Sequence, residues 1–175
     1  MRAYLSAHRC HECLNYTFLS QSTVEACCGA PAASVLQLEN PISAEYSHSR
    51  PTLLPGLLEA FAWNQDKGNA PERLFEVGRV FKPASQGFSE QLSLGFVLAK
   101  SPVFKGGPGN GADYFDAKAY LLQAVARLGL NRATLLYKPV PSDGLFWEGQ
   151  SVALSLPDWG LYGEVGLLKP EITAR

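Results

Sequence analysis

The sequence lacks the features that mark several large classes of protein. Its 175 residues carry a formal net charge of −1, so overall charge does not draw the chain toward nucleic acid or an anionic membrane. No run of residues approaches the roughly 18 apolar positions that a membrane-spanning helix needs, and the first residues lack the pattern of a signal peptide. We find no internal repeat. These absences favour an ordinary globular protein, which we expect to be cytoplasmic.

Cysteine is also scarce. The four cysteines lie in two small groups, Cys10 with Cys13 and Cys27 with Cys28, which are too few and too close together for a disulfide scaffold. The spacing of Cys10 and Cys13 leaves one alternative open, a zinc-binding interaction module. A structural zinc site usually needs two separated ligand pairs, and adjacent cysteines rarely reach one ion together. We therefore expect free thiols that pack as small apolar side chains and bind no ion.

Patterns of common active sites are missing as well. His8, His11 and His48 form no recognisable pair of base and nucleophile, and we expect them on the surface or in loops. The neighbours of His48 are serines, but side chains adjacent in sequence usually point apart rather than form a triad. The glycine-rich segment 105–113 lacks the lysine-serine ending of a phosphate-binding loop and precedes an acidic helix start. We expect a simple loop there.

What the sequence does have is a hydrophobic content of 46%, enough for one globular domain over residues 1–175. The stretch Asn40–Phe81 contains the predicted helix and strand around which we expect the rest of the domain to pack. Apolar residues recur at helical spacing at Leu53, Leu54, Leu57, Leu58 and Phe61. From Leu74 to Phe81 the period becomes two, with Phe75, Val77 and Phe81 on one face and Glu76, Gly78, Val80 and Lys82 on the other. The helix must lie across a sheet that contains this strand, with Leu57 buried.

The remaining elements follow in an irregular order. We expect helices over Met1–Cys10, Ser22–Cys28 and Asp113–Asn131, and a last helix from Pro170. Strands are expected over Cys13–Ser20, Ser34–Leu38, Leu92–Ala99, Thr134–Lys138, Ser151–Leu156 and Gly160–Leu168, with a polar loop over Glu39–Arg50. This order favours an α+β fold with an antiparallel sheet of about six strands over a regular βαβ alternation.

Several unusual sequence motifs follow one another along the chain: NPIS, RPTLLPGLLEA, RLFEVGRVF and DYFDAK. The series resembles the synthetase-core domain of the beta subunits of bacterial-type phenylalanine–tRNA ligases. The resemblance implies a class II aminoacyl-tRNA synthetase-like antiparallel sheet flanked by helices, in agreement with the pattern above. The chain ends after GEVGLLKPE, before a class II core would place its third motif. We therefore expect a C-terminally truncated fragment of a larger beta subunit.

The resemblance also implies what chemistry to expect. A class II site uses an arginine on the second-motif strand to hold the ATP α-phosphate, and a glutamate two residues on. Aligning GRVF with that motif places Lys82 and Ala84 at these positions, and Pro83 between them should end the strand. We expect no catalytic, cofactor-binding or metal-binding residue in this chain. ATP and Mg²⁺ would serve the holoenzyme, and the family's magnesium carboxylates belong to a separate upstream domain.

The resemblance further implies partners. The first helix and the strand after it resemble the first class II motif, which builds subunit interfaces. We expect the chain to dock on the alpha subunit of an α2β2 ligase that charges tRNA(Phe) with phenylalanine, and to meet tRNA(Phe) through that holoenzyme. The predicted contact is an exposed apolar patch around Leu5, Tyr16 and Phe18. A catalytically active class II core and a stand-alone regulatory paralogue stay open as alternatives.

Two features depart from the pattern or stay undecided. Where the family typically has His-Pro-Gly-Arg, this chain has Trp147, Glu148, Gly149 and Gln150, which removes a cation and argues against a phosphate contact there. Gly149 keeps the turn-forming position. The carboxylate of Glu164, between two glycines of a predicted strand, could hold a turn or face a partner.

Overall fold

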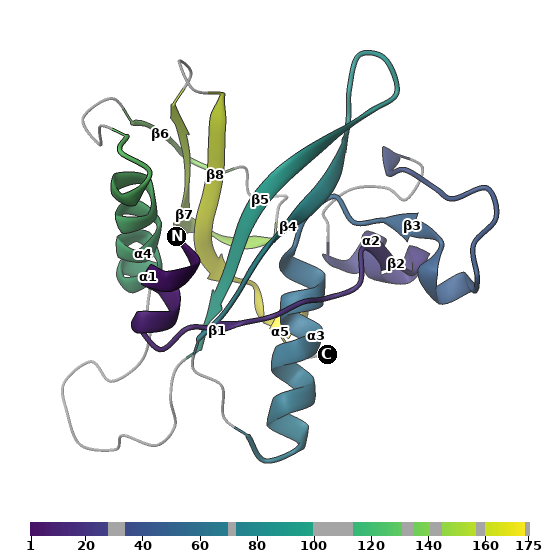
Figure 1. Cartoon of the computed structure of the whole chain (residues 1–175), viewed down its shortest axis with the longest axis horizontal. Helices are drawn as coiled ribbons and strands as arrows, with labels where there is room; N and C mark the ends of the chain where they lie inside the picture. The colour runs from purple at the N-terminus through teal and green to yellow at the C-terminus, as the bar shows by residue number, and fades with distance from the viewer. Residues whose placement is uncertain are drawn as a thin grey trace. The chain divides into compact units, whose positions relative to one another are not determined.

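The computed structural model describes residues 1–27, 34–69, 73–99, 114–130, 135–140, 145–156 and 160–173 (Figure 1). The chain divides into two compact units. One comprises Arg2–Val97, and the other comprises Leu98–Arg175 together with Met1. The expected single domain over residues 1–175 stays a prediction. No helix among the described residues is long and apolar enough to cross a membrane.

The first unit contains two of the sheets. Its helices are α1 (Arg2–Ala7), α2 (Gln21–Cys27), the short 3-10 helix η2 (Ala44–Tyr46) and α3 (Leu54–Asp66). Its strands are β1 (His11–Glu12), β2 (Phe18–Leu19), β3 (His48–Ser49), β4 (Arg73–Pro83) and β5 (Phe88–Leu98). One sheet has the order β1-β4-β5, with β1 parallel to β4, and the other pairs β2 with β3 antiparallel. A tight turn closed by a hydrogen bond from Ala84 N to Gly87 O (2.9 Å) joins β4 to β5.

Helix α3 forms the core of this unit with β4, beside which it lies in Figure 1. Proline in its first turn costs little, because the N–H that it lacks has no partner within the helix there. The predicted burial of Leu57 is confirmed, with none of its surface exposed. Its cluster includes Leu53, Leu74 and Val80, so the helix packs on the face of β4 that also carries Glu76 and Gly78.

The helix reaches that face because two glycines leave room for it. A Cβ atom added at Gly95 of β5 would lie 2.9 Å from Leu53 Cβ and 3.0 Å from Leu57 Cδ1. One added at Gly78 of β4 would lie 3.2 Å from Leu53 Cδ2. A larger residue at either position would push the helix away from the hairpin. The apolar face of α3 therefore packs against the part of the β4–β5 hairpin where the two glycines leave room for its leucine side chains.

The second unit packs one helix against a three-stranded antiparallel sheet. Helix α4 (Tyr114–Arg127) is followed by β6 (Leu136–Lys138), β7 (Phe146–Leu156), β8 (Leu161–Leu168) and α5 (Pro170–Thr173). The strand order is β6-β7-β8, and Val152 pairs with Val165. Buried residues on the helix and the sheet form its core: Ala124, Val125, Leu154, Leu156 and Val165. Gly129 ends α4 with φ at 76°, as its position in the sequence predicts.

The α+β class is confirmed, but the sheets differ from expectation. The described strands form three sheets instead of one sheet of about six strands, and β1 runs parallel to its neighbour. The strand predicted over Cys13–Ser20 is wrong except at Phe18 and Leu19. The strand predicted over Ser34–Leu38 is reduced to one bridge between Gln37 and His48. Cys28 and the glycine-rich segment 105–113 lie outside the described residues.

Two local features follow from hydrogen bonding and backbone geometry. The predicted polar loop over Glu39–Arg50 contains β3, because His48 and Ser49 pair with Leu19 and Phe18 and are buried. In β7 the pairing register shifts between Phe146 and Ser151, around Gly149 with φ at 73°. A bulge of this kind suits a glycine. The departure from the family at residues 147–150 therefore lies on an irregular part of a strand whose residues 147–150 are exposed.

Replacing Leu57 by alanine should lower the free energy of unfolding by about 2–5 kcal/mol, because the cavity would lie between α3 and the β4–β5 hairpin. Urea unfolding of the chain, followed by far-ultraviolet circular dichroism, measures the change. Leu92→Ala is the matched control: Leu92 is 74% exposed, and its truncation should change stability by less than about 0.5 kcal/mol. Equal effects of the two substitutions would contradict the packing of α3 on the β4–β5 hairpin.

Candidate functional site

A buried ion pair lies at the centre of the first unit. Arg50 Nη1 donates a hydrogen bond to Glu76 Oε1 at 2.7 Å, and the side chains are only 6% and 3% exposed. Arg50 Nε donates to the carbonyl oxygen of Arg79 at 2.9 Å, and Asn15 Nδ2 donates to Glu76 Oε2 at 2.7 Å. Charges removed from water are tolerated only when paired and hydrogen-bonded in this way. No pattern in the sequence predicted this pair.

The same cluster holds the segment of residues 13–17 in place. Cys13 N donates to Phe75 O at 2.7 Å, and Arg50 N donates to Thr17 O at 2.9 Å. Arg50 Nη1 also lies 3.4 Å from the carbonyl oxygens of Asn15 and Tyr16. These carbonyls face a guanidinium instead of a neighbouring strand. The segment is therefore ordered without being part of a sheet, which is why the strand predicted here is interrupted.

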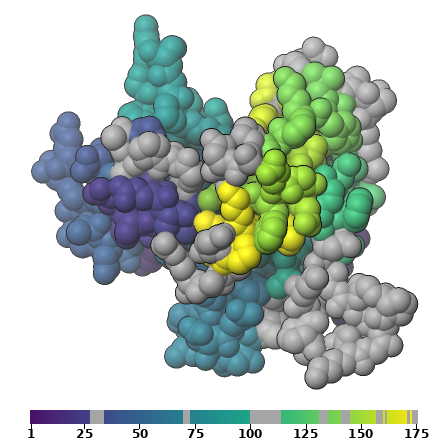
Figure 2. All heavy atoms as spheres, turned by 180° about the vertical axis from the view of Figure 1, so that it is seen from behind, coloured from purple at the N-terminus to yellow at the C-terminus, as the bar shows by residue number. Residues whose placement is uncertain are grey.

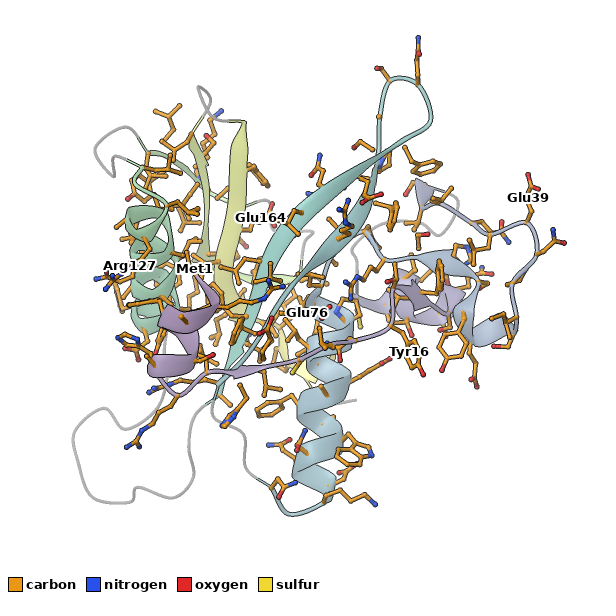
Figure 3. All side chains as sticks on the ribbon, viewed as in Figure 1. Met1, Tyr16, Glu39, Glu76, Arg127 and Glu164 are labelled. Carbon is orange, nitrogen blue, oxygen red and sulfur yellow. The ribbon has the colours of Figure 1, made fainter. Side chains whose placement is uncertain are left out.

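Alternate side chains of this region form an exposed apolar stripe of Leu14, Tyr16 and Phe18, which are 88%, 76% and 37% exposed. The ring of Tyr16 contacts that of Tyr46 with centroids 5.3 Å apart. In Figure 3, Tyr16 lies on the side of its segment away from Glu76. The prediction that Leu5 belongs to an exposed patch is wrong, because Leu5 is 1% exposed. The alternation in CLNYTFLS could have pointed to Leu14 instead.

The positions that the resemblance aligns with the class II motif lie at the end of β4 and in the turn that follows it. The strand ends at Pro83, as predicted, and Ala84 begins the turn into β5. Lys82 is half-buried, and its carbonyl accepts a hydrogen bond from Ser89 Oγ at 3.5 Å. A planar arginine fork and a nearby carboxylate are both missing from positions 82–84.

The cysteines do not converge with other ligands in the described part of the chain. Cys10 is buried, and its Sγ lies 3.9 Å from His8 O. Burial, and then the negative charges of Glu76 and Glu12, raise the pKa of the Cys13 thiol, so Cys13 is less reactive than an exposed thiol. Among described residues no three His, Cys, Asp or Glu side chains come together. That no ion binds at Cys10 and Cys13 stays a prediction.

The histidines are placed differently from one another. His8 and His11 are exposed, as predicted, but His48 is only 3% exposed, which contradicts the expected surface position. Ser47 Oγ lies 2.9 Å from His48 Nδ1, so these two side chains do not point apart. Ser47 Oγ also donates to Ala44 O at 2.9 Å. Because a hydroxyl has one proton, Ser47 can donate to only one of these two groups, and the tautomer in which His48 Nδ1 carries the proton lets both hydrogen bonds form together.

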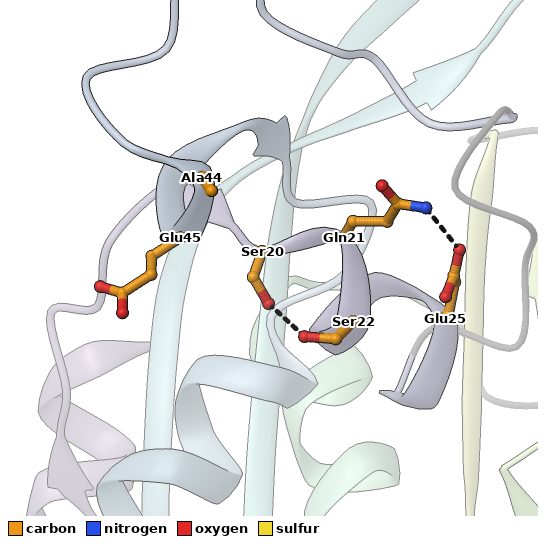
Figure 4. Close-up of a pocket in the computed structure, with 6 residues that line it drawn as sticks. All are labelled: Ser20, Gln21, Ser22, Glu25, Ala44 and Glu45. Carbon is orange, nitrogen blue, oxygen red and sulfur yellow. Dashed lines mark hydrogen bonds between the residues drawn. The ribbon is translucent and has the colours of Figure 1, made fainter.

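A shallow pocket of about 420 Å³ lies beside α2 and η2, lined by Ser20, Gln21, Ser22, Glu25, Ala44 and Glu45 (Figure 4). Figure 2 shows α2 in purple next to the blue segment that contains η2. The hydroxyl of Ser20 caps α2 by accepting from Thr23 N at 3.0 Å. Gln21 Nε2 donates to Glu25 Oε1 at 3.0 Å. These polar groups serve the local structure, and the two glutamates would repel a phosphate.

In the second unit, Glu164 lies on the exposed side of β8 opposite Ala153 and accepts a hydrogen bond from the Tyr162 hydroxyl. Partial burial, together with Glu164, raises the pKa of Tyr162 to about 12. Of the two roles that the sequence left open, the position within a regular strand excludes the turn.

Comparisons with known proteins identify relatives along the whole chain. Residues 1–175 match the family model described as the phenylalanyl tRNA synthetase beta chain CLM domain. The chain is 34% identical to the phenylalanine–tRNA ligase beta subunit of Ruegeria pomeroyi over 163 residues, 93% of this chain and 20% of that protein. It is 36% identical to that of Novosphingobium aromaticivorans over 171 residues, 94% of this chain and 21% of that protein. The chain thus spans about one fifth of the length of these relatives.

Solved structures of a synthetase have a similar fold. A pyrrolysyl-tRNA synthetase from Desulfitobacterium hafniense superposes with a TM-score of 0.64 over 92% of this chain and 53% of that chain, at 18% identity. A second structure of the enzyme from the same organism gives a TM-score of 0.61 over 97% and 56% of the two chains, at 16% identity. At this identity the likeness concerns the fold alone. It confirms the predicted class II synthetase-like architecture.

Replacing Glu76 by glutamine should lower the free energy of unfolding by about 3–5 kcal/mol, because Arg50 would keep its buried charge without a carboxylate partner. Urea unfolding at neutral pH measures the loss. Glu90→Gln is the matched control, since Glu90 pairs with Arg79 where the two side chains are 41% and 71% exposed. Its loss should be below about 1 kcal/mol. A Glu76 variant as stable as the control would show that the buried pair does not hold this unit together.

Proposed function

Because this chain belongs to the phenylalanyl-tRNA synthetase beta chain family, we propose that it is a non-catalytic, class II synthetase-like domain of a beta subunit. In this proposal the domain docks on an alpha subunit within an α2β2 phenylalanine–tRNA ligase of the cytoplasm. The alpha subunit would carry out the chemistry, joining phenylalanine to tRNA(Phe) with ATP and Mg²⁺. The domain would meet tRNA(Phe) through the assembled enzyme.

The observation that carries this proposal is the composition of the end of β4. In a class II site, charge-assisted hydrogen bonds from arginine bind the ATP α-phosphate, and each such bond contributes about 1.5–3 kcal/mol. Here the corresponding positions are Lys82, Pro83 and Ala84. An ammonium lacks the planar fork that holds two phosphate oxygens, and a methyl group cannot replace a carboxylate. In this proposal the domain keeps the class II fold but lacks the arginine and the glutamate that bind ATP. This is what we expect of a non-catalytic domain that packs beside a catalytic one.

The apolar stripe of Leu14, Tyr16 and Phe18 supports the docking role. Exposed aromatic and aliphatic side chains next to one another are typical of partner surfaces. The segment is held rigidly from behind by Arg50 and Asn15, so the stripe is presented in one arrangement. The relatives are beta subunits by name, and we therefore propose the alpha subunit as the occupant of this surface.

The chain should not bind ATP in the class II manner. We expect calorimetric titration of the complete gene product that carries this chain, in the absence of an alpha subunit, to give no binding in the micromolar range. The comparison variant combines Lys82→Arg with Ala84→Glu. It places the arginine and the glutamate of the class II motif at these positions and keeps Pro83. Micromolar affinity of the unmodified protein, abolished by Lys82→Ala, would refute the proposal and favour an active class II core.

Replacing Tyr16 by alanine should weaken association with the alpha subunit about 30-fold, since loss of an aromatic anchor at an interface typically costs about 2 kcal/mol. The dissociation constant is measured by surface plasmon resonance with the complete gene product and its matching alpha subunit. Trp63→Ala is the control, because Trp63 is an exposed aromatic residue (60%) outside the stripe. If Tyr16→Ala binds as tightly as Trp63→Ala, the stripe is not the docking surface.

A further inference from the structure

The apolar stripe is held by a specific buried contact, and we propose that Asn15 is a positioning residue for docking of the alpha subunit. It acts by fixing Leu14 and Tyr16, its two neighbours in the chain, against the Arg50–Glu76 pair. This inference rests on the proposed function, because it concerns the same surface. Asn15 would thus affect the affinity for the alpha subunit although its side chain points away from that partner.

The first support is the direction of the hydrogen bonds. Asn15 Nδ2 donates to Glu76 Oε2 at 2.7 Å, while Oε1 of the same carboxylate accepts from Arg50 Nη1 at 2.7 Å. The carboxylate is fixed by the guanidinium, so it offers Asn15 an acceptor that cannot swing away. Arg50 Nη1 also lies 3.4 Å from the carbonyl oxygens of Asn15 and Tyr16, and the N–H that Glu76 leaves over can donate to one of them. The segment is therefore held mainly through the amide side chain of Asn15, with a weaker contact to its backbone.

The second support is the alternation of exposure along the segment. Leu14 and Tyr16 are 88% and 76% exposed, whereas Asn15 between them is half-buried. An extended backbone sends successive side chains to opposite sides. A contact that fixes Asn15 inward therefore fixes its two neighbours outward. Residues 13–17 belong to no sheet, and the backbone hydrogen bonds described above hold the segment at its two ends, Cys13 and Thr17. The contact of Asn15 with Glu76 holds the middle of the segment.

The third support is the close approach of α3. A Cβ atom added at Gly56 would lie 2.7 Å from Asn15 Cβ and 3.0 Å from Asn15 Cγ. Glycine is unfavourable inside a helix compared with alanine, and here its small size gives Asn15 room beside the first turn of α3. The side chain is thus enclosed by the helix and by the carboxylate of Glu76. A segment fixed before binding loses less conformational freedom when the partner docks.

The test is a double-mutant cycle on the complete gene product with its matching alpha subunit. The variants are Asn15→Ala, Tyr16→Ala and the pair together, with Asn69→Ala as the control for loss of an amide at the exposed end of α3. Asn15→Ala should weaken alpha-subunit binding about tenfold. In the Tyr16→Ala background the same change should weaken binding by less than about threefold, because part of what Asn15 positions is gone. Asn69→Ala should leave binding unchanged.

The outcomes separate the inference from the proposed function. Equal weakening by Asn15→Ala in both backgrounds would mean a general structural effect and would overturn the positioning role, as would no weakening at all. If Tyr16→Ala does not weaken alpha-subunit binding, the apolar stripe is not the docking surface, and the proposed role of Asn15 is refuted with it. Gly56→Ala provides a second route that leaves the amide intact. We expect it to weaken alpha-subunit binding more in the parent than in the Tyr16→Ala background, and an equal effect in both would also overturn the inference.

Discussion

The buried pair of Arg50 and Glu76 is the constraint on which the first unit depends. It joins three parts of the chain that are far apart in sequence: the segment 13–17, the residues before α3, and β4. A charged pair without water is stable only when its remaining donors and acceptors are satisfied. Here backbone carbonyls and the amide of Asn15 meet that need. Gly78 belongs to the same arrangement, because a Cβ atom there would overlap Arg50 Nη2.

Strand β4 contributes both to the buried ion pair and to the positions that the resemblance aligns with a class II motif. Near its start, β4 supplies Glu76 to the buried cluster, and at its end it carries Lys82 and Pro83, where a class II enzyme would hold ATP. The first contribution holds the apolar stripe in place, and the second supplies no phosphate-binding fork. In the proposed role, the domain keeps the packing of a synthetase core while its polar groups serve structure. Under the proposed function, selection would act on the docking surface and its support.

The candidate site could be predicted only in part. The end of β4 at Pro83 followed from the order of residues in one strand, and the structure confirmed it. That these positions carry no catalytic group stays a prediction. The exposed stripe was found at Tyr16 and Phe18 but misplaced at Leu5, which is buried. A short apolar helix gives no sign of which of its residues faces inward. The ion pair could not be found, since 26 residues separate Arg50 from Glu76 and the pattern around Glu76 resembles that of a solvent-facing strand position.

The sequence by itself determined the α+β class, the helix around Leu57, the strand that ends at Pro83 and the glycine that ends α4. These depend on local periodicity, proline geometry and backbone freedom, which act between near neighbours. Only the tertiary structure decided that α3 packs on the face of β4 carrying a glutamate, that His48 is buried, and that residues 13–17 follow Arg50 instead of a sheet. Each of these outcomes depends on which distant group satisfies a buried charge or hydrogen bond, and that choice is made when the elements pack together.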